Sequence, residues 1–128
     1  MRAIIVDDSR ATRMILRKIL ESVGYEVALA ENGQVAYDLL CSSLPFNVPD
    51  VALVDWNMPE MNGIELVEAV RANGDLDSLK IIMCTTETEI SQMTLALMSG
   101  ANEYIMKPFT SDTIVDKLAL LGMPAVMS

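Results

Sequence analysis

Residues 51–59 read Val51-Ala-Leu-Val-Asp-Trp-Asn-Met-Pro59, which is a run of four apolar residues followed by an acidic residue and a turn-forming segment. The run has the length of a strand, and its side chains do not alternate between apolar and polar. A strand that is apolar on both faces is typical of the interior of a parallel sheet covered by helices. The stretch therefore predicts a central strand with Asp55 at its carboxyl end.

The same arrangement of strand and helix recurs on both sides of this stretch. Continuous apolar or β-prone runs predict five strands, at Ala3–Val6, Glu26–Ala30, Val51–Val54, Lys80–Cys84 and Glu103–Met106. Helical spacing of apolar residues predicts five helices, at Arg10–Val23, Gln34–Leu44, Ile64–Ala72, Thr88–Ser99 and Ser111–Leu121. Alternating strands and helices predict an α/β fold, a doubly wound five-stranded parallel sheet with helices on both faces.

Length and composition agree with one globular domain. The chain has 128 residues, of which 52% are hydrophobic and 21% charged. It contains no histidine, which excludes Ser-His-Asp, Cys-His and histidine-based metal sites. Cys41 and Cys84 lie within apolar stretches, so we expect two buried thiols. We interpret residues 1–122 as one domain and residues 123–128 as a short tail.

Charge and hydropathy narrow the classes of partner. The formal net charge is −9, which argues against nucleic-acid binding through the whole surface. No signal peptide is apparent and no apolar run approaches the roughly 18 residues of a membrane span, so we expect a cytoplasmic protein without membrane contact. Four basic residues cluster in the first predicted helix: Arg10, Arg13, Arg17 and Lys18. We favour a solvated helix face over a docking site for this cluster.

Chemically active side chains follow four of the five predicted strands. They are Asp7 and Asp8 after the first, Asp55 and Asn57 after the third, Thr85 and Glu87 after the fourth, and Lys107 after the fifth. Ligands bind at the carboxyl ends of the strands in such sheets, so these groups should gather at one edge. Each group alone has a structural explanation, such as a helix cap or a turn. Their joint occurrence favours a functional site.

The gathered groups are suited to phosphoryl transfer. Three carboxylates in one cleft repel each other, and a hard divalent cation such as Mg²⁺ relieves that repulsion. A carboxylate can act as the nucleophile toward phosphorus. Mg²⁺, the ammonium group of Lys107 and the hydroxyl group of Thr85 would supply positive charge and hydrogen bonds to the phosphoryl oxygens.

The set of motifs resembles the receiver domains of two-component response regulators over essentially the whole chain, from Ile4 to about Leu121. The matching segments are Val6-Asp7-Asp8-Ser9, Asp55 to Pro59 with Asn62-Gly63, Thr85-Thr86-Glu87, and Tyr104 through Lys107-Pro108-Phe109. Within that family the motifs look most like those of the single-domain, CheY-like chemotaxis regulators. The resemblance implies a flavodoxin-like (βα)5 fold with strand order 2-1-3-4-5.

The resemblance also implies the role of each site residue. Asp55 is the phosphoacceptor, while Asp8, Asp55 and the backbone carbonyl of Asn57 bind Mg²⁺ directly, with Asp7 acting through water. Lys107 contacts the phosphoryl group, and its bond to Pro108 is cis. Thr85 and Tyr104 form the switch. Asn57 and Glu87 tune the lifetime of the phosphoryl group, which we expect to be seconds to minutes. The expected activity is phosphotransfer and autodephosphorylation rather than turnover of a free substrate.

The resemblance implies two kinds of partner. One is a sensor histidine kinase (CheA-like) or a phosphotransfer protein that supplies the phosphoryl group. The other is a downstream protein, bound through a face that contains Ile90, Met93, Leu97 and Tyr104. The helix that carries the first three is apolar nearly all round, unlike its basic counterpart in chemotaxis regulators. We expect a partner or a phosphorylation-dependent homodimer there in preference to thicker local packing.

Three other interpretations stay open at the level of sequence. Asp55-Trp56-Asn57 also resembles the nucleophile motif of Mg²⁺-dependent phosphohydrolases, although there the motif follows the first strand. A flavodoxin-like flavin carrier shares the strand order, but Asp7 and Asp8 would repel the flavin phosphate. The chain could also be a receiver domain from a longer regulator.

Overall fold

The protein forms one five-stranded parallel sheet in the computed structural model. The structure describes residues 1–44, 46–56, 58, 61–86 and 90–123. For Thr86, Ile90, Gln92 and Met93 it describes the backbone alone. The strand order is β2-β1-β3-β4-β5, as the resemblance implies. The strands are β1 (Arg2–Val6), β2 (Glu26–Ala30), β3 (Val51–Asp55), β4 (Lys80–Thr86) and β5 (Glu103–Lys107). β3 lies in the centre, so the chain reverses its direction of winding between β1 and β3.

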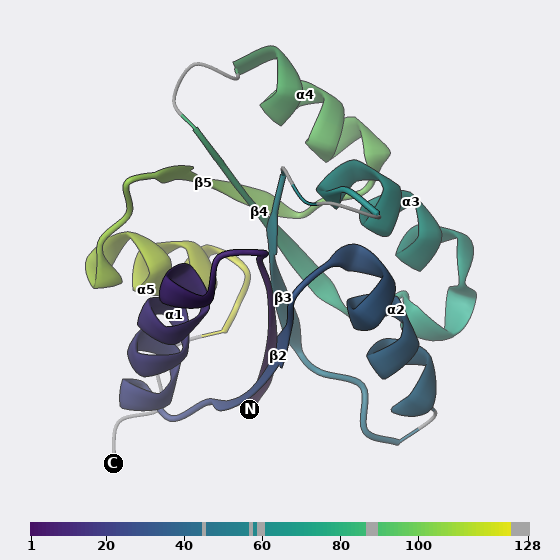
Figure 1. The fold of residues 1–128 in the computed structure, drawn as a ribbon, viewed down its shortest axis with the longest axis horizontal. Coiled ribbons are helices and arrows are strands. Elements are labelled where there is room, and N and C mark those ends of the chain that lie inside the picture. Colours follow the sequence, from purple (N-terminus) through teal and green to yellow (C-terminus); the bar gives the residue numbers. More distant parts are fainter. Residues whose placement is uncertain (45, 57, 59–60, 87–89, 124–128) are drawn as a thin grey trace.

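Five α-helices connect and cover the strands in the described part of the chain. They are α1 (Arg10–Ser22), α2 (Gly33–Ser42), α3 (Gly63–Ala72), α4 (Ile90–Ser99) and α5 (Ser111–Leu120). Figure 1 shows α1 and α5 on one face of the sheet and α2, α3 and α4 on the other. The predicted α/β architecture is therefore confirmed.

The continuous apolar runs are explained by two separate cores, one on each face. On β3, Val51 and Leu53 belong to the core under α1 and α5, whereas Ala52 and Val54 belong to the core under α2, α3 and α4. Successive strand residues point to opposite faces, and here both faces are buried. All five residues of β3 are buried, which fixes Asp55 rigidly at the end of the strand.

Helix starts on the site edge are set by short polar caps. Ser9 and Asn32 cap α1 and α2 by accepting hydrogen bonds from the backbone N–H groups of Thr12 and Val35. Asn62 and Glu65 form a reciprocal capping box at the start of α3. These caps hold the loops that follow β1, β2 and β3 at the carboxyl edge of the sheet.

Some predicted details are wrong. The second helix begins at Gly33, one residue before the predicted start at Gln34, and Asn32 caps it. That helix ends at Ser42 rather than Leu44, and a short 3₁₀ helix, Gly74–Leu76, precedes β4. Cys84 is buried as expected, but Cys41 is only partly buried because it lies in the last turn of α2.

Helix α4 is more exposed than its apolar sequence suggests. Of its described side chains, only Ala96 is buried; Leu95, Leu97 and Met98 are 49%, 41% and 82% exposed. The described apolar side chains Leu95, Leu97 and Met98 of α4 are therefore largely open to solvent in this chain. Among the helices that the structure describes, none is long and apolar enough to cross a membrane.

Candidate functional site

The site lies at the carboxyl ends of β1, β3 and β5. Asp7 and Asp8 follow β1, Asp55 is the last residue of β3, and Lys107 is the last residue of β5. The parallel register places Asp55 beside Cys84 of β4, the residue before Thr85. Residues separated by up to 100 positions are thus brought to one edge, as the sequence predicted.

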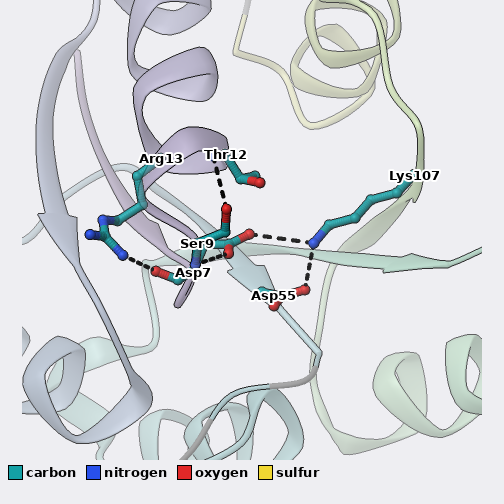
Figure 2. A network of polar contacts seen from close by, with 6 residues as sticks. All are labelled: Asp7, Ser9, Thr12, Arg13, Asp55 and Lys107. Carbon is teal, nitrogen blue, oxygen red and sulfur yellow. Dashed lines mark hydrogen bonds and ion pairs between the residues drawn. The ribbon is translucent and has the colours of Figure 1, made fainter.

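An ion-pair network centres on Lys107. Its Nζ atom lies 2.8 Å from Oδ1 of Asp55 and 3.4 Å from Oδ2 of Asp7. Figure 2 shows the lysine side chain reaching across from β5 toward both carboxylates. Asp7 and Asp55 are only 1% and 7% exposed, so these charges are removed from most of the solvent and interact strongly.

Asp7 is held by further contacts from α1. Its Oδ1 atom accepts a hydrogen bond of 2.8 Å from the backbone N–H of Ser9, and its backbone carbonyl accepts one of 2.6 Å from the guanidinium group of Arg13 (Figure 2). The backbone N–H of Asp7 donates to the carbonyl of Ala30. The loop after β1 is therefore fixed from both α1 and β2.

The electrostatics of the site perturb both partners of the central ion pair. Burial raises the pKa of Asp55 above its usual value, although the hydrogen bond from Lys107 opposes that effect, and the charges of Asp7 and Asp8 add to it. Burial alone would lower the pKa of Lys107, but the hydrogen bond and charge of Asp55, together with Asp7, raise it. Lys107 is therefore a stable cation at neutral pH beside an unusually basic carboxylate.

The carboxylates are arranged in a way that suits a divalent cation. One oxygen from each of Asp7, Asp8 and Asp55 lies within 4.8 Å of the others. Lys107 contacts two of the three, so the described side chains of the cluster retain an excess of negative charge. An all-oxygen donor set with excess negative charge fits Mg²⁺ better than a softer metal.

Two neighbouring features complete the described edge. Thr85, near the end of β4, is buried and only 3% exposed. Burial raises the pKa of the thiol of the adjacent Cys84 to about 12. Such a thiol stays protonated at neutral pH and is a packing group rather than a nucleophile. The peptide bond between Lys107 and Pro108 is cis in this structure.

Tyr104 lies on β5, three residues before Lys107, and contacts α5. Its ring packs against the core under α2, α3 and α4, and Nζ of Lys117 lies 4.6 Å from the ring centroid. Lys117 also pairs with Glu103 at 3.1 Å. Tyr104 is thus half-buried with a cation over its face.

Some predicted residues lie outside the described part of the chain. These are Asn57 and Glu87, and the side chains of Ile90 and Met93. Of the predicted output face, Leu97 and Tyr104 are described; Leu97 is exposed.

Sequence reasoning missed the roles of three residues. Arg13 was noticed only as part of a basic cluster, and Ser9 only as part of a matching motif. Their spacing of four residues on a helix places both over the preceding loop, which was a usable signal. Lys117 gave no signal, because its contact with Tyr104 depends on how α5 packs beside β5.

The chain belongs to the response regulator family: the sequence profile of the response regulator receiver domain matches residues 3–119. The domain that carries this site on a 2-1-3-4-5 sheet is therefore a receiver domain, and within the family it is CheY-like. It is 43% identical to a chemotaxis protein CheY homolog of Campylobacter jejuni over 119 residues, 92% of this chain and 89% of that protein. It is 41% identical to the chemotaxis protein CheY1 of Helicobacter pylori over 122 residues, 94% and 96% of the two chains.

Solved structures agree with this assignment. A structure of the chemotaxis protein CheY4 of Vibrio cholerae superimposes with a TM-score of 0.81 at 34% identity, covering 93% of this chain and 96% of that one. A putative response regulator of Chloroflexus aurantiacus gives a TM-score of 0.85 at 30% identity, covering 94% and 97%.

Proposed function

We propose that this receiver domain accepts a phosphoryl group on Asp55 from a phosphohistidine of a sensor kinase or phosphotransfer protein, in a Mg²⁺-dependent reaction. The observation that carries the proposal is the position of Asp55, which is buried at the end of β3, 2.8 Å from Lys107 and within a cluster of three carboxylates. That is the arrangement expected of a carboxylate nucleophile with a fixed cation beside it.

The chain's own residues perform the transfer. A carboxylate oxygen of Asp55 attacks phosphorus, the bond from phosphorus to the donor nitrogen breaks, and its electron pair stays on the imidazole. The burial that raises the pKa of Asp55 also makes its ionised form a stronger nucleophile. Lys107 moves from the carboxylate to the phosphoryl oxygens and stabilises their charge. Thr85, at the end of the neighbouring strand, is placed to donate to the same group.

Mg²⁺ would be held by Asp8, Asp55 and the backbone carbonyl of Asn57, with Asp7 acting through water. When bound, the ion supplies the positive charge that the carboxylate cluster lacks and screens the incoming phosphoryl group from it. Asp7 is kept in place by Ser9 and Lys107, so its orientation does not depend on the ion.

The switch that follows uses Thr85 and Tyr104. Phosphorylation draws Thr85 toward the new group, and Tyr104 turns inward behind it and leaves the cation of Lys117. The face formed by α4, β5 and α5 then changes, which alters binding of a downstream protein or a second copy through Ile90, Met93, Leu97 and Tyr104. The phosphoryl group acts on this face only through such a shared two-state element.

Two further aspects rest on similarity. The names of the curated relatives support a role in chemotaxis. From the family resemblance we also infer a cytoplasmic location and a CheA-like kinase as the donor. Asn57 and Glu87 match, in sequence, the two positions at which the family controls water attack, so we infer autodephosphorylation within seconds to minutes.

Trp56 provides a direct test, because the only tryptophan follows Asp55 in sequence and is partly buried. Treatment with Mg²⁺ and acetyl phosphate should change its fluorescence and add one phosphoryl group by intact mass. Asp55→Asn should abolish the adduct, while Asp116→Asn, at an exposed position on α5, should retain it. A persistent adduct in Asp55→Asn would refute the assignment.

A further inference from the structure

A groove lies at the opposite end of the sheet from Asp55. It has a volume of about 260 Å³ and is formed by the start of β1, the edge strand β2 and the end of α2. Its apolar wall includes Ile4, Ala28 and Leu39, of which Ala28 and Leu39 are exposed. A cavity of about 150 Å³ lined by apolar groups is enough to hold benzene, so this groove has room for a phenyl ring.

An exposed phenyl ring stands beside the groove. Phe46 is 89% exposed, more than any other large hydrophobic side chain in the described part of the chain. Ser43 and Asn47, which flank it, both line the groove. The loop that carries it follows α2 on the lower side of the view in Figure 1, near the N-terminus.

The loop is anchored on either side of Phe46. The backbone N–H of Asn47 donates to the carbonyl of Ser43 at 2.8 Å, and the Arg2 guanidinium donates to Oδ1 of Asn47 at 3.1 Å. Arg2 also donates through its backbone N–H to Asp50 at 2.8 Å. These contacts hold the backbone next to Phe46, so part of the cost of fixing the ring for binding is already met.

We propose that Phe46 of one copy enters this groove on a second copy, forming a two-fold symmetric dimer. A projecting ring and a matching groove on one patch make that patch self-complementary, which is the property of an isologous interface. Both rings are then buried, and the assembly closes at two copies.

Charge on the patch supports a second copy as the occupant. The formal net charge of −9 opposes self-association over most of the surface. Arg2 and Glu26, which line the groove, carry opposite charges, lie 3.5 Å apart and have 49% and 81% of their side chains exposed. Within each copy these two charges already form a pair, so the patch is locally balanced in charge, and two copies can approach one another here with less repulsion than the net charge alone would give. Because the interface is remote from Asp55, it is independent of the proposed phosphorylation.

Sedimentation velocity up to about 500 µM tests the proposal, since this range detects dissociation constants from micromolar to near millimolar. Wild type should form dimers, and Phe46→Ser should weaken the association by about tenfold or more, as for a buried aromatic anchor. Met98→Ser, which removes an 82% exposed apolar side chain from α4, is the matched control and should leave association unchanged. Asp55→Asn should also leave it unchanged.

A complementation experiment tests the contact itself. Ala28→Arg should obstruct the groove while leaving Phe46 in place, and alone it should be as monomeric as Phe46→Ser. An equal mixture of the two variants should recover part of the association, because Phe46 of one meets the intact groove of the other. Circular dichroism checks that both variants fold.

Three results would overturn the proposal. They are a monomeric wild type at about 500 µM, an equal loss of association in Met98→Ser, and a mixture that stays monomeric. If the groove instead holds Phe46 of the same chain, or takes up only a small apolar molecule, the wild type will remain monomeric at about 500 µM.

Discussion

Asp55→Asn should make the metal-free protein more stable at neutral pH, although it removes the residue on which the proposed function depends. The carboxylate of Asp55 is 7% exposed and shares the site with two other carboxylates. An amide of the same shape keeps hydrogen-bonding capacity but carries no charge. Whether the free energy of unfolding rises or falls depends on two opposing contributions. Repulsion between the carboxylates and the cost of burying the Asp55 charge favour the variant, whereas the attraction of Lys107 favours wild type.

The distances allow the terms to be compared. At an effective dielectric constant of about 20, carboxylates separated by at most 4.8 Å repel by about 3.5 kcal/mol per pair, and less for the exposed Asp8. Lys107 at 2.8 Å attracts Asp55 by about 6 kcal/mol on the same scale. These terms nearly cancel, so the cost of burying the charge decides the balance, in agreement with the raised pKa of Asp55. We expect the substitution to raise the free energy of unfolding by about 1–3 kcal/mol, because Lys107 still has Asp7 as an ion-pair partner and is not left unpaired.

Thermal unfolding in EDTA measures this difference. For a domain of this size, about 1 kcal/mol corresponds to a rise of ~4 °C in Tm. The difference in Tm between the variant and wild type should be largest at neutral pH. It should shrink as the pH falls through the raised pKa of Asp55, because the wild-type carboxyl group then becomes protonated and no longer buries a charge. Added Mg²⁺ should stabilise wild type more than the variant.

The matched control is Asp116→Asn, an exposed carboxylate on α5, which should change stability by less than about 0.5 kcal/mol. If Asp55→Asn is less stable than wild type in EDTA at neutral pH, the attraction of Lys107 dominates and the reasoning is wrong.

Two substitutions test the scaffold around the site by thermal unfolding. Gly63→Ala should cost about 1–3 kcal/mol, because the new Cβ atom would lie 2.6 Å from the backbone carbonyl oxygen of Asp55 and 3.1 Å from Cα of Trp56. Gly74→Ala should be nearly neutral, because the nearest atom to its new Cβ, Oδ2 of Asp77, would lie 3.9 Å away, in ordinary van der Waals contact. If Gly63→Ala and Gly74→Ala lower the stability equally, Gly63 does not lie as close to the backbone of Asp55 as the structure shows. Arg71→Met should cost about 2–4 kcal/mol, because the Arg71 side chain donates to the carbonyls of Gly100 and Leu79 and ties α3 to the loop before β5. A loss below about 0.5 kcal/mol would mean that water replaces these bonds.

The sequence alone determined the class of fold and most of the site. Continuous apolar strands such as Val51–Val54 are informative because a side chain buried on either face of a sheet must be apolar. Because parallel strands run in one direction, their carboxyl ends lie at one edge of the sheet, so the sequence alone groups Asp7, Asp55, Thr85 and Lys107. The strand order itself came from family resemblance.

The remaining features were decided by tertiary packing. The choice of Asp55 and Asp7 as partners of Lys107, the contact of Arg13 with the loop after β1, and the cation over Tyr104 depend on how helices seat against the sheet. For α4, helical periodicity reports which residues are apolar, not how much neighbouring structure covers them, so only the packing shows that Leu95, Leu97 and Met98 are exposed. The groove beside Phe46 has the same origin: local sequence sets the ring and its turn, whereas the space between β2 and α2 exists only once distant segments pack together.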